Sequence, residues 1–464
     1  MAGAGARLSL GRGIASRLRV PPPCRLAHAA SASAEITSLK DEDCSGFLHW
    51  LQRKAGTQIS AVLTLGSSAF GRSLFALEPI KEGDCIMEVP YDVQLTQDKF
   101  PVEVRILLDN VVGDTAKVAV LLMMEQHLGH VESGWEPYVK SLPCKGQMHN
   151  MMLWDLNELH MVRNSSIYNE AIEQKDQAKK EFSAVKPILE HFPHLFGETN
   201  VEDFMLASAL VSSRAWWTLR GVSLIPFADF LNHDGFSNSI LLYDEQKDVC
   251  EVIADRSYAV GEQVMIRYGK FSNATLALNF GFTFSRNVYD QVHIWIDMPE
   301  QDLLCREKLD IWERHHSPKA EDMFSCGRTK ISFVIKKAKS SRGKGIGVPE
   351  ILRAFFRVFY STSLEELEEM TMEAARNDGR LARRPLENTE REIHAHRMLL
   401  LHLNDEIQGY STAIEQLEIA NDPASRSVHP FRKEMAKDLL VGELRVLQSA
   451  SAWVANYCES LSMS

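Results

Sequence analysis

Several common signatures of function are missing from this sequence. Its eight cysteines include no Cys-x-x-Cys pair, so neither a cysteine zinc site nor a dithiol redox centre is indicated. The longest uninterrupted apolar run, residues 118–124, is far shorter than the roughly 20 residues of a membrane-spanning helix. The motifs of P-loop, dinucleotide-binding, zinc-protease and serine-hydrolase sites are also missing. We therefore expect no metal centre and no membrane span.

The chain is also short of positive charge. It carries 51 Lys and Arg against 62 Asp and Glu, a formal net charge of −11. An acidic protein is repelled by nucleic-acid phosphates, so nucleic acid is not an expected partner. The 464 residues, of which 45% are hydrophobic and 24% charged, suffice for more than one globular domain.

Residues 1–34 have a composition unlike the rest of the chain. They contain several arginines and much Ala, Gly and Ser, and the first acidic residue is Glu35. This composition is typical of an organellar transit peptide, which would not be part of the fold. A basic tail without a targeting role is the alternative. We expect import into the chloroplast, with the mitochondrion as the second choice.

Strand-like segments lie on both sides of a helical stretch. The helical stretch, at about residues 95–220, contains apolar spacings that predict helices near 118–128 and 201–220. The predicted strands lie at residues 61–63, 74–76, 85–89, 239–243, 249–253 and 263–268. The strands therefore belong to one domain that a helical insert divides.

Beyond residue 297 the pattern becomes helical. Apolar residues at three-four spacing form one seam along a helix that Asn421-Asp422-Pro423 ends. The seam consists of Leu400, Leu403, Ile407, Tyr410, Ile414 and Leu417. The short length of the seam favours a helix packed within a helical domain over a dimerising coiled coil. A last helix is predicted from about residue 430 to 458, and we expect a monomer.

The clearest motif signal is a series of short pieces in a fixed order. The pieces are Ser213-Arg214, Pro226-x-x-Asp229-x-x-Asn232-His233, the run 261–269 that ends in Arg267-Tyr268-Gly269, and Ser272-Asn273 followed by Phe280-Gly281-Phe282. Together they resemble the SET-domain methyltransferases, in the branch typified by the plant RuBisCO large-subunit lysine methyltransferases. The resemblance spans residues 41–464 and includes Trp135-x-Pro137-Tyr138 in the helical stretch.

The resemblance implies an α+β fold with two parts. Residues 41–296 would form a SET domain of small β-sheets with the helical insert, and residues 297–464 an all-helical substrate-binding domain of the RuBisCO-methyltransferase type. The implied activity is S-adenosylmethionine-dependent methylation of a protein lysine. The implied substrate is a plastid protein such as the RuBisCO large subunit or fructose-bisphosphate aldolase.

Two other functions stay open. An animal relative of this branch methylates histidine, whose neutral imidazole suits the same displacement reaction. A non-catalytic scaffold of an organellar complex is the alternative from a different class. Residues 328–344 carry seven Lys and Arg and no acid; this segment is predicted to be an exposed loop rather than an RNA-binding element.

The resemblance also assigns site residues. Arg214 would pair with the methionyl carboxylate of the cofactor, because a guanidinium holds two oxygens in fixed geometry. Asn232 and His233 would seat its adenine and amino groups. The implied cofactor-binding set is Phe70, Gly71, Arg72, Arg214, Asp229, Asn232, His233 and Tyr268.

Tyr268 matches the catalytic tyrosine of the family, whose hydroxyl lies beside the transferring methyl group. Tyr243, Phe280 and Phe282 are the implied substrate contacts.

Two departures from the family pattern stand out. Ser73 replaces the second glycine of a Gly-x-Gly loop, which would weaken cofactor binding, and Phe280 replaces the tyrosine of a Tyr-Gly-Phe triplet, which removes a hydroxyl that could restrain the acceptor amine.

Overall fold

The computed structural model describes residues 42–463 with internal gaps. The gaps are residue 70 and residues 298–301, 316–329, 342–344, 377–378, 380, 382–383 and 420–427. The segment expected to be a transit peptide, residues 1–34, and the predicted cofactor contact Phe70 both lie outside the described residues. The described chain begins with helix α1 (Glu42–Ala55).

Three small sheets form the first part of the fold. The predicted strands lie in two of them, although the strand predicted at 61–63 overlaps β1 only at Leu63, and the third sheet was not predicted. One sheet has the order β1-β2-β10-β7, with β1 (Leu63–Ser68), β2 (Gly71–Ala76), β10 (Gln263–Ile266) and β7 (Asn232–His233). The second is β3 (Cys85–Pro90), β9 (Val249–Ile253) and β8 (Leu241–Asp244), and the third is β4 (Leu95–Thr96), β6 (Gly221–Leu224) and β5 (Trp216–Thr218). Each sheet therefore combines strands from before and after the insert.

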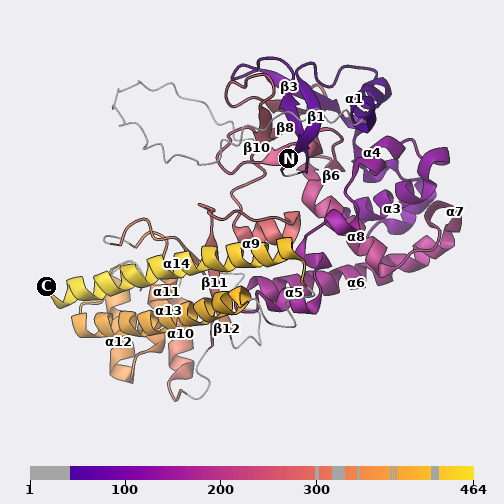
Figure 1. Cartoon of the computed structure of the whole chain (residues 1–464). Helices are drawn as coiled ribbons and strands as arrows, with labels where there is room; N and C mark the ends of the chain where they lie inside the picture. Colours follow the sequence, from indigo (N-terminus) through magenta and orange to yellow (C-terminus); the bar gives the residue numbers. More distant parts are fainter. Residues whose placement is uncertain are drawn as a thin grey trace, which may run out of the picture. The chain divides into compact units, whose positions relative to one another are not determined.

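The insert lies between β4 and β5 and is helical (Figure 1, purple to magenta). Its helices are α2 (Val102–Leu108), α3 (Asp114–Glu132), α4 (Glu136–Ser141), α5 (Leu156–His160), α6 (Ile167–His191), α7 (Pro193–Phe196) and α8 (Val201–Arg214). The predicted helix at 201–220 was too long, because α8 ends at Arg214 and the next residues form β5. Gly221, at φ +101°, allows the tight turn that pairs Thr218 with Gly221.

The C-terminal part is mainly helical. It contains α10 (Cys305–His315), α11 (Glu350–Phe359), α12 (Leu364–Arg376), α13 (Thr389–Glu418) and α14 (Pro430–Ser462). Figure 1 shows α13 and α14 running side by side. Leu403 and Tyr410 of the predicted apolar seam are fully buried there, at 0% and 1% exposure, so the packed-helix interpretation is confirmed.

The predicted fold class is confirmed, except that the C-terminal part is not all-helical. Strand β11 (Gln291–Asp297) pairs antiparallel with β12 (Lys330–Lys336). The prediction of an exposed basic loop was therefore wrong for residues 330–336. The alternating side chains Ile331, Phe333 and Ile335 are buried, and this two-residue period was present in the sequence between the lysines.

Two hydrophobic cores underlie these parts. One core joins the three sheets to α3, α8 and the end of α6, and the other joins β11, β12 and the C-terminal helices to residues 151–171 of the insert. The second core encloses a bidentate ion pair between Arg357 and Glu392, with both side chains at 0% exposure.

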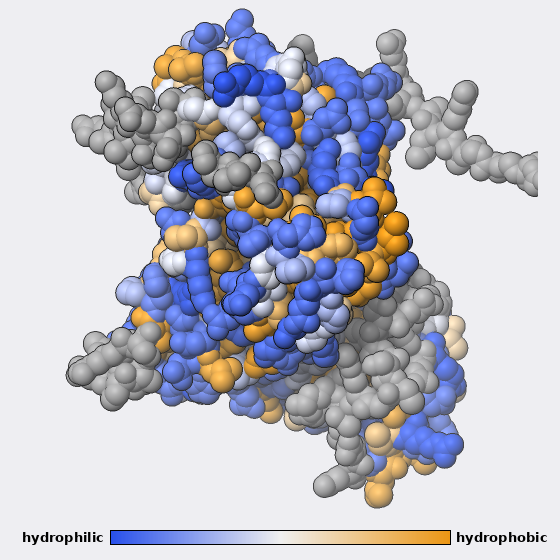
Figure 2. All heavy atoms as spheres, turned by 90° about the vertical axis from the view of Figure 1, so that its right-hand side faces the viewer, coloured by the Kyte–Doolittle hydropathy of each residue, from blue (hydrophilic) through white to orange (hydrophobic). Residues whose placement is uncertain are grey.

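Among the described helices, none combines the length and apolarity needed to cross a membrane. Figure 2 shows hydrophilic residues around several hydrophobic patches on one face.

A buried carboxyl group lies where the insert meets the C-terminal helices. Glu443 of α14 is 3% exposed and accepts hydrogen bonds of 3.0 Å from the hydroxyls of Ser165 and Tyr410. Burial raises the pKa of Glu443 from 4.5 to about 8, and the nearby Asp290 and Glu170 act in the same direction.

The raised pKa of Glu443 predicts a pH-dependent stability. Between pH 4.5 and about 8 the folded state holds a proton that the unfolded state releases, so the free energy of unfolding falls as the pH rises through this window. Glu443→Gln should reduce this fall, measured by urea unfolding at several pH values. The exposed Glu365→Gln on α12 is the control and should leave the slope unchanged; an unchanged slope in Glu443→Gln would contradict the assignment.

Candidate active site

Tyr268 lies two residues after the end of β10, beside the residue pair Asn232-His233. Parallel pairing of β10 with β7 places Met265 next to Asn232 and Ile266 next to His233. The Tyr268 N–H donates to His233 Nδ1 (3.1 Å), and its hydroxyl donates to the Leu231 carbonyl oxygen (2.5 Å). The structure therefore brings together two motifs that lie more than thirty residues apart in the sequence.

Aromatic rings surround Tyr268. His233 stacks on it at a centroid distance of 5.1 Å, Phe280 lies at 5.3 Å, and Trp216 meets it edge-on at 5.9 Å and 89°. Further rings extend the group outward through Phe280 and Phe282. We call this group the aromatic cluster: Trp216, His233, Tyr268, Phe271, Phe280, Phe282 and Phe284.

The backbone conformation of Gly281 fixes the position of Phe280 and Phe282. Gly281 ends the π-helix Leu276–Phe280 in the left-handed region, at φ +78°. A Cβ atom there would lie 2.7 Å from the Asn150 backbone nitrogen, so only glycine fits. The Asn150 side chain also donates to the Asn279 carbonyl oxygen. The insert therefore supports this wall of the aromatic cluster directly.

Arg214, Asp229 and Tyr138 form a second group. Arg214 Nη1 donates to the Asp229 carbonyl oxygen at 3.0 Å and lies 3.5 Å from its carboxylate, while the Tyr138 hydroxyl donates to Asp229 Oδ2 at 2.9 Å. The Asp229 side chain is 0% exposed and that of Arg214 21%. Burial raises the pKa of Asp229, and the Arg214 charge opposes this shift. Within the described chain, Arg214 Nε and Asp229 Oδ1 are buried without a hydrogen-bond partner.

The β1–β2 turn contributes the third group. Gly71 has φ +87°, a conformation that glycine adopts without strain. The Arg72 guanidinium donates to the Ser141 carbonyl oxygen at the end of α4, and the Asn232 side chain donates to Ser73 Oγ at 2.6 Å. Gly71, Arg72 and Asn232 are thus brought together, as the resemblance implies.

Tyr243 is not part of the aromatic cluster. It lies on β8 in the second sheet, where its hydroxyl donates to Asp248, and Asp248 also pairs with Arg220 at 2.9 Å. Its contact with substrate stays a prediction. No role was predicted for Trp216 or Tyr138, although Trp216 lies two residues after Arg214 and Tyr138 lies in the motif Trp135-x-Pro137-Tyr138.

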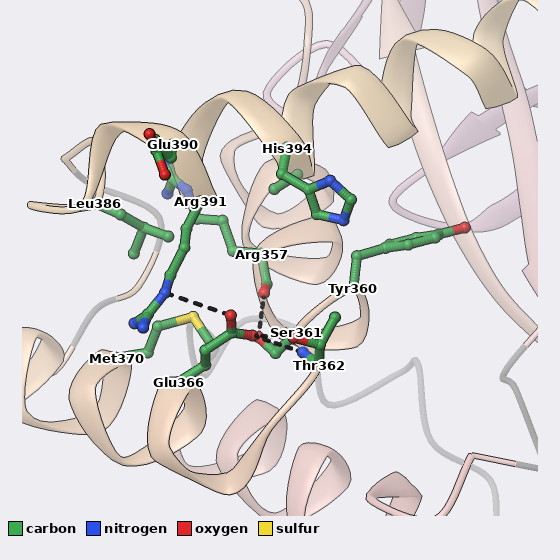
Figure 3. A pocket seen from close by; sticks show the side chains of 11 residues that line it. Arg357, Tyr360, Ser361, Thr362, Glu366, Met370, Leu386, Glu390, Arg391 and His394 are labelled. Carbon is green, nitrogen blue, oxygen red and sulfur yellow. Dashed lines mark hydrogen bonds and ion pairs between the residues drawn. The ribbon is translucent and has the colours of Figure 1, made fainter.

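Two other places in the described chain, a cluster of possible metal ligands and a pocket, could also bind a ligand. Cys85, Glu88 and Glu251 lie close enough to hold a metal ion, but Lys247 already pairs with Glu88 at 2.8 Å and with Glu251 at 3.7 Å. Among the C-terminal helices, a pocket of about 290 Å³ is lined by Arg391, Glu366 and Met370 among others (Figure 3). Arg391 pairs there with Glu366 and Glu369, so neither place offers the arrangement found around Tyr268.

Comparison with known proteins agrees with the fold. Residues 71–269 match the family model of the SET domain, and residues 299–447 match the family model described as Rubisco LSMT substrate-binding. Solved structures of Rubisco LSMT bound to AdoMet, and to sinefungin and monomethyllysine, align with TM-scores of 0.69 and 0.70 at 21% and 22% identity, over 91% of this chain and 93% of theirs.

Curated relatives include both lysine and histidine enzymes. The chloroplastic [fructose-bisphosphate aldolase]-lysine N-methyltransferase of Arabidopsis thaliana is 25% identical over 88% of this chain and 82% of its own length. The actin-histidine N-methyltransferase of Mus musculus is 24% identical over 82% of this chain and 63% of its own length.

The fold and these matches define a SET-type protein methyltransferase. Within that class, the chain belongs to the branch that joins a SET domain to a Rubisco LSMT substrate-binding domain. S-adenosylmethionine is the methyl donor of the family and therefore the cofactor of this chain.

Because Asp229 is buried, the hydrogen bond that it accepts from Tyr138 should stabilise the fold. Tyr138→Phe keeps the packing but leaves the buried carboxylate with one donor fewer, so the free energy of unfolding should fall by about 1–3 kcal/mol. Urea unfolding measures this loss. The control is Tyr91→Phe, whose half-exposed hydroxyl donates to Asp98 at 3.1 Å and should matter less. Equal stability of the two variants would contradict the role of Tyr138.

Proposed function

We propose that this protein transfers a methyl group from S-adenosylmethionine to a lysine side chain of an organellar protein. The observation that carries the proposal is the placement of Tyr268, whose hydroxyl and ring lie inside the aromatic cluster and beside Asn232-His233. S-adenosylmethionine supplies an electrophilic methyl group, so the protein has to hold the acceptor in line with that group and exclude water.

The cofactor would be held by the groups around Asp229 and the β1–β2 turn. Arg214 is partly exposed and its buried Nε has no partner among the described residues, which fits a guanidinium that takes a carboxylate. Asp229 is fully buried, so we assign it to positioning Arg214 rather than to direct contact. Asn232, His233, Gly71 and Arg72 complete the set, and Phe70 belongs to it by resemblance alone.

Tyr268 would orient the acceptor amine. Burial raises the pKa of its hydroxyl, so the phenol stays protonated at neutral pH and keeps its hydrogen-bond function. The same desolvation disfavours a charged ammonium group, and the neutral amine is the nucleophile that methyl transfer needs. Ring faces of Phe280 and Trp216 suit the alkyl chain and the charge of a lysine before it loses its proton.

Histidine is the second candidate acceptor, because curated relatives include actin-histidine N-methyltransferases. An imidazole requires a polar partner for its other ring nitrogen. Four of the seven rings of the aromatic cluster are phenylalanines, which offer no such partner, and this supports lysine. Mass spectrometry of the methylated product separates methyllysine from methylhistidine.

The proposed substrate and compartment are based on a curated relative and on the composition of the N-terminal segment. The relative from Arabidopsis thaliana is a chloroplastic aldolase-lysine N-methyltransferase, and residues 1–34 have the composition of a transit peptide. We propose fructose-bisphosphate aldolase or the RuBisCO large subunit as the substrate, in the chloroplast.

Tyr268→Phe tests the catalytic assignment. The variant keeps the ring, so affinity for S-adenosylmethionine should change little, whereas kcat should fall by on the order of 10² because the hydroxyl no longer orients the amine. Methyl transfer to aldolase or RuBisCO measures kcat, and calorimetry measures cofactor binding.

The matched control for this test is Tyr258→Phe. Tyr258 is 4% exposed and its hydroxyl donates to Asp255 at 2.9 Å, outside the aromatic cluster, so this variant should keep its activity. Equal kcat in Tyr268→Phe and the parent protein would reject the assignment. A parent protein that binds no S-adenosylmethionine at millimolar concentration would instead support a non-catalytic scaffold.

A reporter fusion tests the proposed chloroplast localisation. Residues 1–40 fused to a fluorescent protein should carry it into chloroplasts, since the segment is rich in arginine and poor in acid. Fluorescence microscopy of plant cells shows the compartment. Fluorescence in mitochondria would assign the protein to the mitochondrion instead. Cytosolic fluorescence would contradict the transit peptide.

A further inference from the structure

Ser73 is a buried residue beside the proposed cofactor site. It lies on β2 opposite Gly66 and is 0% exposed. Strand β10 lies between β2 and β7, and the side chains of Ser73 and Asn232 meet across β10 through a hydrogen bond of 2.6 Å. The residue that departs from the Gly-x-Gly pattern therefore touches a residue of the proposed cofactor-binding set.

The hydrogen bonds of Ser73 Oγ can be fully accounted for. A hydroxyl accepts two hydrogen bonds and donates one. Asn232 Nδ2 and Gln263 Nε2 donate to it at 2.6 and 3.1 Å, and its own proton goes to Ser68 Oγ at 2.8 Å or to the Gly71 carbonyl oxygen at 3.2 Å. The hydroxyl is saturated, so its position and that of the Asn232 amide are fixed together.

The same contacts determine which way the Asn232 side chain points. Its Nδ2 also lies 3.5 Å from the Arg72 carbonyl oxygen, and a carbonyl oxygen only accepts hydrogen bonds, so the nitrogen must face β2. The Oδ1 atom is then left as an acceptor, and it has no partner among the described residues. Asn232 is half-buried, and its Oδ1 is not among the buried atoms that lack a partner, so a ligand can reach this oxygen.

We propose that Ser73 is a positioning residue for cofactor binding, because it holds Asn232 with its carboxamide oxygen turned toward a donor N–H group of the cofactor. This inference rests on the proposed role of Asn232. It reverses the expectation drawn from the sequence, in which Ser73 only weakens binding. Restoring the family glycine with Ser73→Gly should therefore lower the affinity for S-adenosylmethionine rather than raise it.

Calorimetric titration of the full chain with S-adenosylmethionine tests the proposal. Ser73→Ala and Ser73→Gly should each raise Kd by about tenfold, as expected for the loss of one oriented hydrogen bond. Gln263→Ala is the matched control, since it removes the other donor to Ser73 Oγ but leaves Asn232 bound; its Kd should stay within about twofold. Thermal unfolding of each variant without cofactor shows which variants are folded.

A double variant separates positioning from a general structural effect. If Ser73 acts through Asn232, Ser73→Ala should not weaken binding further in an Asn232→Ala background. Additive losses of affinity, or an unchanged Kd in Ser73→Ala, would overturn the proposal. An unchanged Kd in Asn232→Ala alone would instead reject the proposed cofactor site. If neither Ser73→Ala nor Ser73→Gly folds, the nearly isosteric Ser73→Cys takes their place, because a thiol is only a weak hydrogen-bond acceptor: a raised Kd supports the proposal, and an unchanged Kd overturns it.

Discussion

The buried carboxylate of Asp229 is the constraint on which the rest of the site depends. It receives Tyr138 from the short helix α4 and lies beside Arg214 at the end of α8. A buried charge of this kind is costly unless its partners stay in place. The last turn of α8, the segment before β7 and helix α4 of the insert are therefore fixed relative to one another, and Arg214 is held with part of its side chain exposed.

The helical insert consequently does more than separate strands. Its Asn150 backbone packs against Gly281 and supports the wall that carries Phe280 and Phe282. The insert is in turn held by α14, where Arg432 donates to Glu158 and to the Leu153 carbonyl oxygen. A continuous series of contacts thus runs from the C-terminal helices through the insert to the aromatic cluster.

Local sequence patterns predicted the elements of the fold well where one pattern was strong. Spacing alone predicts strands β2, β3, β9 and β10, the apolar residues of α3 and the seam of α13. Prediction failed where two patterns compete. The apolar residues after Arg214 continue a helical spacing, but the turn at Gly221 converts them into the hairpin of β5 and β6. In β12 the flanking lysines hid a buried two-residue alternation.

The sequence by itself determined the family, the order of the motifs and most of the residues proposed for the site, because these depend on residue type and spacing along the chain. Only the tertiary structure decided which of them meet. It placed Trp216 against Tyr268, left Tyr243 in another sheet, and turned Ser73 from an apparent defect into a partner of Asn232. The physical reason is that parallel pairing of β10 with β7, and the packing of the insert onto both, are contacts between distant segments that no local pattern encodes.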